Sequence, residues 1–525
     1  MTLTKTEPTP PNPGSTLIQH LLSPQAYPHP VTAVRLIETH ISWVLLTGDF
    51  AYKIKKPVNF GFLDFSTLEL RRQYCQEELR LNRRLAEDWY LGVVAITGSL
   101  EQPHIEGDGE AIEYAVKMRQ FPTGLTLKDR VKCGQVDRTE IDQITDLLAD
   151  FHAHIAKAEA ASHYGGSADI KHWFEENFAH LRPRLKDDRQ LKQLQAIEDG
   201  GQVEWLLKAG LMEDRKRAGF VRECHGDMHL GNMTSIDGQI ILFDCIEFNP
   251  MLRWIDVVSE VAFLIIDLLH FNLDALAYRF LNRYLQRTGD YQGVALLRYY
   301  LVYRALVLAK VSLLRSEQQH DPALLEQNLA EYRVYANLAE RFTQPSKPML
   351  LITHGFSGSG KSYHAVRLAE RIGAVQLRSD IERKRLYGFS AEQNTGSTTG
   401  GGIYSEEATQ LTYDRLAAEA KTVLEAGFTV IVDATFLKTA QRKQFWQLAS
   451  ECGVPFRILD FQVPDSVLIQ RILQRQHQDA SEATLAVLQR QQQNAEPLHP
   501  EEQALTSTID FDNEQAIAWT FSQLT

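Results

Sequence analysis

Two carboxylates and one amide in the middle of the chain have types and spacing suited to chemistry. Residues 224–233 read CHGDMHLGNM, which places Asn232 five residues after Asp227, and the strand-like run GQIILFDCIEF that follows carries Asp244. An aspartate can orient a hydroxyl group and take its proton, whereas an asparagine and a second aspartate can ligate Mg²⁺. The spacing therefore predicts a catalytic base, Asp227, and two metal ligands, Asn232 and Asp244, with a hairpin turn at 234–238. The alternative is that Asp227 and Asn232 only form a turn.

Such a site needs a cation for nucleotide phosphates, and one candidate lies upstream. The run DFAYKIKK places Lys53 and Lys55 on one face of a predicted strand, because side chains alternate along a strand. We expect Lys53 to contact the α- and β-phosphates, and Glu78 of the helical segment CQEELRLN to pair with it. Three neighbouring charged residues are expected to be solvated or flexible: Lys55, Lys56 and Glu77.

These residues resemble the aminoglycoside phosphotransferase and choline-kinase branch of the protein-kinase fold, in which HGD-x-x-x-x-N replaces HRD-x-x-x-x-N. The resemblance covers about residues 30–340. It implies a two-lobed kinase fold with ATP between the lobes, adenine against the backbone near Met118, and a small-molecule hydroxyl group as acceptor. Two departures stand out. No G-x-G-x-x-G precedes Lys53, so another loop is expected to cover the phosphates, and FDCIEF replaces D-F-G, where Glu247 is expected to add a ligand or a structural hydrogen bond.

A phosphate-binding loop stands further on. Residues 355–362 read GFSGSGKS and fit G-x-x-x-x-G-K-[ST], with an apolar strand before them and a helix after them. Glycines let successive backbone N–H groups turn toward phosphates, while the lysine reaches the β- and γ-phosphates and the final hydroxyl ligates Mg²⁺. The alternative, a glycine-rich turn without a ligand, is disfavoured because motif and context agree. The residues expected to hold ATP are Gly355, Ser357, Gly358, Ser359, Gly360, Lys361 and Ser362, the last also as a metal ligand.

Residues suited to phosphoryl transfer follow this loop. Asp380 in LRSDIERKRL can take a proton from an acceptor hydroxyl or cap a helix, and Arg383 can hold a phosphate of the acceptor. Asp433 ends the strand FTVIVDAT, which is a Walker-B-like position for Mg²⁺ or an ordinary strand-end turn. Arg471 and Arg475 lie one turn apart on a predicted helix, where they can neutralise phosphate charge or face solvent.

The loop, LRSD-x-x-R, IVDAT and the helix with Arg471 and Arg475 resemble the small P-loop kinases of the zeta-toxin, polynucleotide 5′-kinase and gluconate-kinase type. This resemblance covers about residues 348–525. It implies an ATP-dependent kinase acting on a hydroxyl group, with Asp380 as the base and the arginines clamping phosphates. As a whole, the chain is similar to bacterial fusions of an aminoglycoside-phosphotransferase-like domain with a P-loop-kinase-like domain.

The length of 525 residues exceeds what one hydrophobic core supports, so several domains must position these residues. We expect a multidomain α+β and α/β chain: a two-lobed kinase-like fold followed by a P-loop α/β fold with a parallel sheet. Ser66 is the expected N-cap of the helix carrying Glu78, and the Gly/Thr-rich tract 395–402 is an expected mobile loop. The predicted segments are a disordered tail (1–15), an N-lobe (16–120), a helical C-lobe (121–341), a linker (342–348) and the P-loop kinase domain (349–525).

Composition narrows the class of partner. The formal net charge is −12 at pH 7, which disfavours a general nucleic-acid binder but leaves a local basic groove as an option. The five cysteines show neither zinc spacing nor a disulfide framework, and no apolar run approaches the ~20 residues of a membrane helix. The N-terminus carries no apolar signal region. We therefore expect a cytoplasmic protein without a membrane partner; the sequence indicates no oligomeric state.

Together, these patterns predict a bifunctional phosphotransferase that uses ATP and Mg²⁺ at one active site in each half and acts on hydroxyl groups of small molecules. Two alternatives stay open. The C-terminal half could act on a nucleic-acid 5′-end or a nucleotide sugar. The N-terminal half could be a pseudokinase that senses a ligand and regulates the P-loop domain.

Overall fold

The structure is a computed structural model that describes residues 13–61, 63–122, 124–317, 321–391, 393–395, 401–474 and 484–509. Residues 1–12 of the predicted tail, residues 396–400 of the Gly/Thr-rich tract, and Arg475 lie outside this part of the chain. The chain forms two compact units. Unit 1 contains Met1–Val136, Ile155–Gly165 and Gly219–Ile255, and unit 2 contains Asp137–His154, Gly166–Ala218 and Asp256–Thr525.

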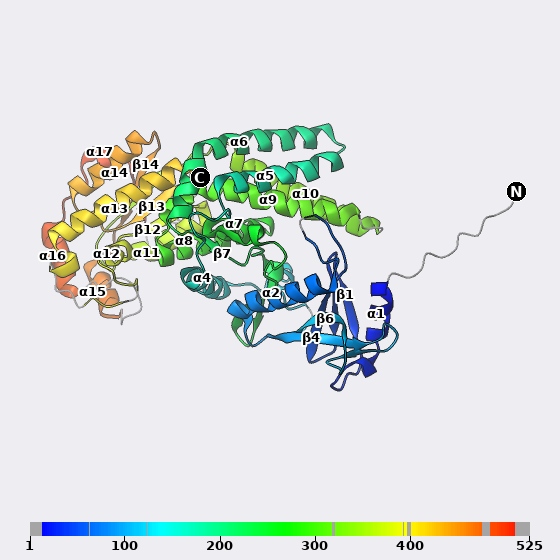
Figure 1. Cartoon of the computed structure of the whole chain (residues 1–525). Helices are drawn as coiled ribbons and strands as arrows, with labels where there is room; N and C mark the ends of the chain where they lie inside the picture. Colours follow the sequence, from blue (N-terminus) through cyan, green and yellow to red (C-terminus); the bar gives the residue numbers. More distant parts are fainter. Residues whose placement is uncertain are drawn as a thin grey trace. The chain divides into compact units, whose positions relative to one another are not determined.

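A six-stranded antiparallel sheet forms the centre of unit 1, in the order β1-β2-β3-β6-β4-β5 (Figure 1). Its strands are β1 (Arg35–Glu38), β2 (Ser42–Leu46), β3 (Phe50–Lys55), β4 (Tyr90–Gly98), β5 (Pro103–Ile105) and β6 (Ala111–Arg119). On one face, Tyr52 and Ile54 of β3 pack in a core with α1 (Pro13–Leu21). On the other, Val116 packs in a core with residues of α2 (Leu68–Ala86). Since side chains alternate, Lys53 and Lys55 point to the α2 face.

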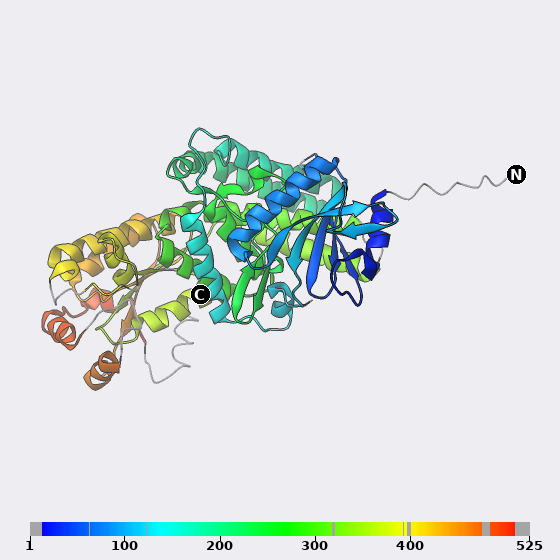
Figure 2. The same ribbon diagram turned by 60° about the horizontal axis from the view of Figure 1, so that its bottom comes forward.

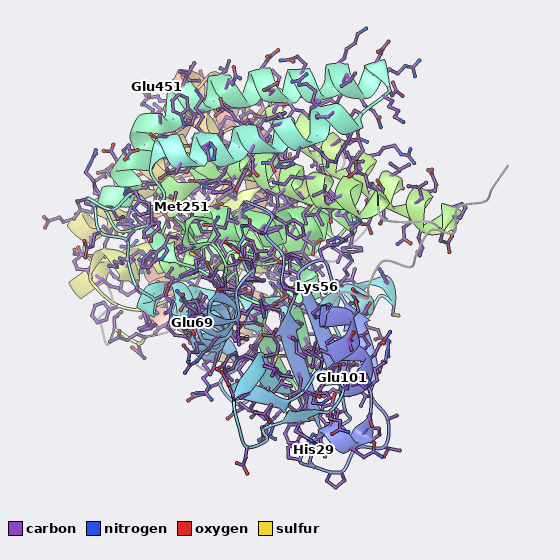
Figure 3. The ribbon with its side chains drawn as sticks, turned by 45° about the vertical axis from the view of Figure 1, so that its right-hand side comes forward. His29, Lys56, Glu69, Glu101, Met251 and Glu451 are labelled. Atoms are coloured by element: carbon purple, nitrogen blue, oxygen red, sulfur yellow. The ribbon has the colours of Figure 1, made fainter. Side chains whose placement is uncertain are left out.

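The N-cap of α2 is Thr67, whose side chain accepts a hydrogen bond from the backbone N–H of Leu70. The expectation that Ser66 caps this helix is wrong. The N–H of Ser66 is donated to Oδ1 of Asp64 at 2.9 Å, so a local turn precedes the helix and delays its start by one residue. Figure 3 labels Glu69 in the first turn of α2 and Lys56 just beyond the end of β3.

The catalytic-loop candidates of unit 1 lie between short strands: β7 (Val221–Glu223), β8 (Met233–Ile236) and β9 (Gln239–Leu242). The turn between β8 and β9 contains only Asp237 and Gly238, whose φ angles of 51° and 78° suit a two-residue hairpin. The predicted turn at 234–238 is therefore too long, because residues 234–236 belong to β8. The helix α3 (Leu127–Lys132) follows β6, and β10 (Trp254–Asp256) is where the chain passes into unit 2.

Helices make up the first part of unit 2. They are α4 (Arg138–His154), α5 (Ser167–Leu181), α6 (Asp188–Arg217), α7 (Val257–His270), α8 (Asp274–Thr288), α9 (Val294–Glu317) and α10 (Pro322–Thr343). Helices α4 and α8 are joined by ion pairs at matching spacings, Asp142–Arg279, Asp146–Arg283 and Asp150–Arg287. Helix α10 includes the first two residues of the predicted linker. Within the described ranges, no helix is long and apolar enough to cross a bilayer.

A five-stranded parallel sheet forms the second part of unit 2, in the order β12-β13-β11-β14-β15. Apolar residues of α11 form a core with Leu351, Ile431 and Leu459 of the sheet, and helices flank the strands in Figure 2. The elements are β11 (Leu350–His354), α11 (Lys361–Ile372), β12 (Val375–Arg378), α12 (Ser379–Leu386), α13 (Glu406–Glu425), β13 (Val430–Asp433), α14 (Thr439–Glu451), β14 (Phe456–Phe461), α15 (Asp465–Gln474), α16 (Leu485–Asn494), α17 (Pro500–Gln503) and β15 (Thr506–Ile509).

Candidate functional site

A three-residue ion cluster lies on the α2 face of the sheet in unit 1. Nζ of Lys53 is 2.9 Å from Oε1 of Glu78 and 2.5 Å from Oδ1 of Asp244. Burial by itself would lower the pKa of Lys53, but the carboxylates of Asp244 and Glu78 hold it well above its ordinary value. The structure thus brings together a protonated lysine, the helix acid predicted to pair with it, and a predicted metal ligand.

Lys55 extends this cluster inward. Its side chain is fully buried, its Nζ lies 2.8 Å from Oε2 of Glu78, and it also pairs with Glu247. The expectation of a solvated Lys55 is wrong, because Lys55 shares the inward face of β3 with Lys53. Burial would raise the pKa of Glu78, but the two lysines lower it to about 2. Burial raises the pKa of Glu247, and its ion pair with Lys55 is the kind of structural contact that was one of its two expected roles.

The two other charged residues expected to be solvated also have partners. Nζ of Lys56 is 2.6 Å from Oε1 of Glu38 and lies over the ring of Trp43. Oε1 of Glu77 is 2.7 Å from Arg80 and 2.6 Å from Arg253. Both side chains are partly buried and ion-paired, and for Glu77 one partner, Arg253, lies 176 positions away in sequence.

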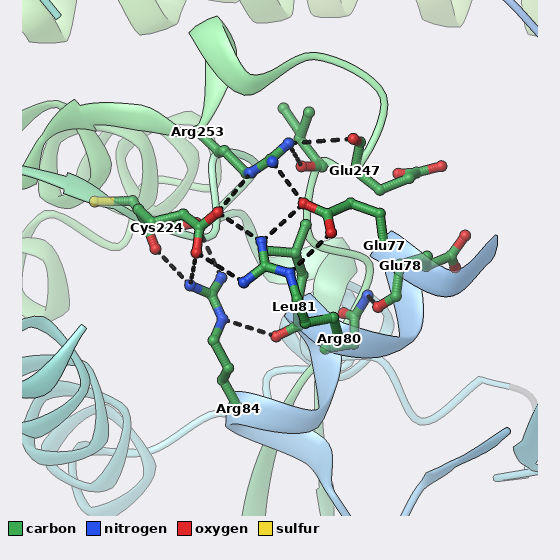
Figure 4. Close-up of polar contacts among 11 residues, drawn as sticks. Glu77, Glu78, Arg80, Leu81, Arg84, Cys224, Glu247 and Arg253 are labelled. Carbon is green, nitrogen blue, oxygen red and sulfur yellow. Dashed lines mark hydrogen bonds and ion pairs between the residues drawn. The ribbon is translucent and has the colours of Figure 1, made fainter. Parts of the chain in front are cut away.

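Glu223 ties α2 to the strand that leads into the loop carrying Asp227, and Figure 4 labels its three arginine partners, Arg80, Arg84 and Arg253. Its carboxylate is buried and accepts hydrogen bonds from Arg80 at 2.6 Å, from Arg84 at 3.2 Å and from Arg253 at 3.2 Å. Burial alone would raise the pKa of Glu223, but these three guanidinium groups lower it. Because α2 also carries Glu78, this cluster holds the helix acid in register with Lys53.

We expect Glu223→Gln to lower the free energy of unfolding by about 2–3 kcal/mol, because the charge that three arginines share is removed. Thermal or urea denaturation measures this change. The control is Glu101→Gln, at an exposed position, which should stay within about 0.5 kcal/mol of the parent. Equal stability of the two variants would show that the cluster does not anchor α2.

The loop that carries Asp227 in unit 1 is held by contacts of His225 with the backbone. Nε2 of this buried imidazole is 2.9 Å from the carbonyl oxygen of Phe243, and Nδ1 accepts from the N–H of Asp227 at 3.3 Å. Gly226 follows with a φ of 91°, and a Cβ there would stand 2.9 Å from the carbonyl oxygen of Leu252. The His-Gly pair therefore builds a tight loop that only glycine fits, and it fixes the backbone of Asp227.

The predicted base and one predicted metal ligand are in direct contact. Nδ2 of Asn232 donates to Oδ2 of Asp227 at 2.9 Å, which leaves Oδ1 of Asn232 as its possible ligand atom. Burial would raise the pKa of Asp227, but His229, His225 and Asn232 lower it to about 2. An aspartate that stays ionised orients a hydroxyl group and takes its proton late in the transfer.

Asp244 occupies an unusual backbone conformation. Its φ is 67°, which non-glycine residues rarely adopt, and its N–H is donated to the hydroxyl of Tyr90 at 3.2 Å. The next N–H, of Cys245, is donated to Oδ1 of Asn82 on α2 at 2.9 Å. The segment that carries Asp244 is therefore fastened to β4 and to α2, and such fixed carboxylates suit a metal ion.

Met118 lies near the end of β6, beside Ala51 of β3 and Tyr90 of β4. Its side chain is partly buried against a core that also contacts Phe243. Aromatic rings extend this surface, since the rings of Phe121 and Phe243 are 5.2 Å apart. An apolar surface at this strand end is of the kind that a purine contacts, and the role of Met118 stays a prediction.

The glycine-rich loop between β11 and α11 has the backbone of an anion-binding turn. Gly355, Gly358 and Gly360 have φ angles of 142°, 86° and 87°. A Cβ on Gly355 would stand 2.8 Å from the carbonyl oxygen of Phe461, so this position admits only glycine. Nζ of Lys361 donates to the carbonyl oxygen of Phe356 at 2.7 Å, so the lysine lies over its own loop. These residues fit a nucleotide phosphate held at a helix N-terminus.

Two side chains from later helices contact the same loop. Gln491 of α16 accepts from the N–H of Ser357 at 2.9 Å and donates to its hydroxyl at 3.0 Å. Arg471 of α15 donates to the carbonyl oxygen of Gly358 at 3.4 Å. Arg471 therefore lies beside the loop, and its contact with phosphate stays a prediction, whereas its helical neighbour Arg475 lies outside the described residues. Ser359 of the loop is buried and within 3.3 Å of Nζ of Lys361.

The remaining residues predicted for the P-loop site differ in their surroundings. Asp433 is buried at the end of β13, where burial raises its pKa while Arg378, Ser362 and Lys361 lower it. Asp380 lies in the first turn of α12, whose N-cap is Arg378, so the alternative role of Asp380 as the cap is wrong. Arg383 is buried and donates to the carbonyl oxygen of Ile403 at 2.9 Å, which ties α12 to the segment before α13.

Several residues around the two sites escaped sequence reasoning. Glu223, Asn82 and Tyr90 hold the elements of unit 1, and Gln491 holds the glycine-rich loop of unit 2. No motif marks them, because each acts through a contact with a distant segment. Only Lys55 had a usable signal, since its i, i+2 spacing from Lys53 places both on one strand face.

Known proteins resemble this chain in whole or in part. A family model described as an AAA domain matches residues 350–498. The uncharacterized protein Rv2004c of Mycobacterium tuberculosis (strain H37Rv) is 30% identical over 426 residues, which are 81% of this chain and 83% of that protein. The uncharacterized protein Mb2027c of Mycobacterium bovis matches with the same values. This chain belongs to their family.

Two solved structures are similar to separate parts of this family member. A sugar kinase from Janibacter sp. HTCC2649 is 22% identical and covers 34% of this chain and 95% of its own, with a TM-score of 0.25. A choline/ethanolamine kinase family protein from Mesorhizobium loti is 9% identical and covers 62% and 99%, with a TM-score of 0.35. In the family member, the region matched by the AAA domain model contains the glycine-rich loop, residues 355–362, and most of the parallel sheet.

Proposed function

We propose that this protein is a bifunctional ATP- and Mg²⁺-dependent phosphotransferase with one active site in each half, and that small-molecule hydroxyl groups are its acceptors. The observation that carries the proposal is that each half holds a lysine, a carboxylate and a hydroxyl- or amide-bearing ligand in one place. In unit 1, Lys53 pairs with Asp244, and the N–H of Phe243, next to Asp244, donates to the carbonyl oxygen of Asn232 at 3.0 Å. In the P-loop domain, Lys361 and Ser362 both lower the pKa of Asp433.

The residues divide the work in each site. In unit 1, Lys53 binds phosphate, Asn232 and Asp244 hold the metal ion, and Asp227 orients the acceptor hydroxyl and takes its proton. In the P-loop domain, Lys361 and the loop N–H groups bind phosphates, Ser362 and Asp433 hold the metal ion, and Asp380 is the base. A bound Mg²⁺ ion would neutralise negative charge on the transferred phosphoryl group. Positioning and electrostatic stabilisation then suffice to accelerate the transfer.

The test is a metabolite screen that monitors ADP release in parallel from the wild type, Asp227→Ala and Lys361→Ala. We expect some acceptors to lose turnover only with Asp227→Ala and others only with Lys361→Ala, because each residue serves a different site. An acceptor whose turnover neither change lowers would contradict the assignment of both sites.

A second candidate for the N-terminal half is a ligand-sensing pseudokinase. The turn between β1 and β2, residues 39–41, contains no glycine that could fold over a phosphate, and Lys53 is engaged by Asp244. The full chain carrying Lys361→Ala separates the two functions. If ATP and Mg²⁺ raise its melting temperature in a manner that needs Asp244, but no acceptor is phosphorylated, the sensing function is favoured.

Nucleic acid is the less favoured acceptor of the P-loop site, because the net charge is −12. Phosphorylation of an oligonucleotide 5′-end by the wild type, abolished in Lys361→Ala, would reverse that preference.

A further inference from the structure

The edge of the P-loop sheet is completed by a side chain from outside the P-loop domain. Strand β12 has β13 on one side and stands at the end of the sheet order. On the other side, Nδ2 of Asn282 in α8 donates to the carbonyl oxygen of Ala374 at 2.9 Å, and its Oδ1 accepts from the N–H of Gln376 at 2.7 Å. The carboxamide makes the pair of hydrogen bonds that a neighbouring strand would make, and it is only 6% exposed.

Gln376 carries this contact from the strand edge to a predicted metal ligand. Its side chain is buried, its Nε2 donates to Oδ2 of Asp433 at 3.0 Å, and its Oε1 accepts from Nε2 of Gln286 in α8 at 3.2 Å. Because an ionised carboxylate offers only acceptors, the amide NH₂ of Gln376 must face Asp433 and its carbonyl must face α8. Both ends of this carboxamide are thus fixed.

The carboxylate of Asp433 has few other neighbours that decide its orientation. Nε of Arg378, two residues beyond Gln376 and on the same strand face, is 3.9 Å from the same Oδ2 atom. Both contacts hold Oδ2 from strand β12, because Gln376 and Arg378 lie on that strand. Contacts of this kind, one step removed from a metal, set ligand orientation and metal affinity.

We propose that Asn282 and Gln376 are positioning residues that hold Asp433 for its metal ion, so that helix α8 completes the metal site of the P-loop domain. This inference rests on the proposed function of Asp433 as a metal ligand. It means that the P-loop domain depends on the helical part of unit 2 for its metal affinity. It also means that a shift of α8 by one hydrogen-bond length would change that affinity.

The experiment measures Mn²⁺ affinity by electron paramagnetic resonance in the presence of ADP, on the full chain carrying Asp244→Asn so that the N-terminal ligand set contributes nothing. In this background we compare Gln376→Leu, Asn282→Leu, Asn282→Asp and Asp433→Asn. The control is Arg283→Ala, on the same helix, which removes an ion pair with Asp146 of α4 instead. Melting temperature and metal-free ADP affinity are recorded for each variant.

We expect Gln376→Leu and Asn282→Leu to weaken Mn²⁺ binding about ten-fold, with Arg283→Ala within two-fold of the parent. Asn282→Asp keeps an acceptor for the N–H of Gln376, so its loss should be smaller than that of Asn282→Leu. The affinity for ADP without metal should change little in all of these variants. A general loss of folding would instead lower that affinity as well.

Two results would overturn the inference. Unchanged Mn²⁺ affinity in Gln376→Leu and Asn282→Leu, with a loss in Asp433→Asn, refutes the positioning role but leaves Asp433 as a ligand. Unchanged affinity in Asp433→Asn as well refutes the positioning role together with the proposed metal site.

Discussion

Lys55→Met is expected to lower the free energy of unfolding of unit 1 by about 3–5 kcal/mol, although Lys55 belongs to no recognised motif. Lys55 is fully buried, and its ammonium group pairs with Glu78 and with Glu247. Without it, two buried carboxylates face each other with one positive charge, that of Lys53, to compensate them. Removing one member of a buried ion cluster leaves charge that neither water nor protein stabilises.

The adjacent lysine is a matched control for this prediction. Lys56→Met removes an equal charge one residue away, but its partner Glu38 is largely exposed, so the change should stay within about 1 kcal/mol. Hydrogen–deuterium exchange of peptides from β3 and α2 measures both effects locally. Equal protection in the two variants would contradict a stabilising role of Lys55.

The destabilisation by Lys55→Met should also depend on pH. Burial already raises the pKa of Glu247, while Lys55 lowers it, so removal of Lys55 raises that pKa further. A carboxyl whose folded pKa is raised binds more protons when folded, so its protonation favours the fold at low pH and this benefit is lost as pH rises. We therefore expect a smaller difference from the wild type at pH 5 than at pH 8. Adding Glu247→Gln to Lys55→Met should recover part of the stability at pH 8.

Asp227→Asn is expected to lower phosphoryl transfer at the N-terminal site by about 10³-fold, within the range that general bases contribute. Asparagine keeps the size of the side chain and can still accept the hydrogen bond from Asn232, but it cannot take a proton. The rate is measured as ADP release with an acceptor from the screen, in a chain carrying Lys361→Ala so that the P-loop site is silent.

The control for Asp227→Asn is His229→Gln. Nε2 of His229 is 3.3 Å from Oδ2 of Asp227, and this histidine helps to lower the pKa of the aspartate. Its loss should therefore raise that pKa but leave the carboxylate ionised near pH 7, so the rate should change by less than about 10-fold. If Asp227→Asn loses no more activity than His229→Gln, Asp227 is not the group that orients the acceptor.

Short-range patterns in the sequence predicted the parts of the fold that depend on local spacing. Side-chain alternation along β3 predicted that Lys53 and Lys55 share one face of the strand. The glycine-rich loop predicted a strand before it and a helix after it. The pairing of Lys53 with Glu78 followed from their order along the chain and is present at 2.9 Å. The same local reasoning placed the N-cap of α2 one residue too early. Ser66 forms a turn with Asp64, and the sequence alone does not distinguish such a turn residue from an N-cap.

The contacts that the sequence did not predict join segments that are far apart in the chain. Lys55 meets Glu247 across 192 positions, and Glu223 meets Arg80 across 143. Whether a lysine on a strand faces solvent or an interior carboxylate depends on what packs on that face, and that information lies in another part of the chain. For this reason Lys55 and Glu77 were predicted to be solvated.

By itself, the sequence determined which residue types stand at which spacing: the HGD-x-x-x-x-N segment with Asp244, and the G-x-x-x-x-G-K-S loop with Asp433. These patterns can be read from the sequence alone, because a loop or a strand end positions residues that are near one another in the chain. Only the tertiary structure decided that Lys55 is buried, that Glu223 anchors α2, and that Asn282 completes the edge of β12. Each of these depends on charge and hydrogen-bond partners meeting after the chain has packed, since burial makes an unpaired polar group costly and a paired one specific.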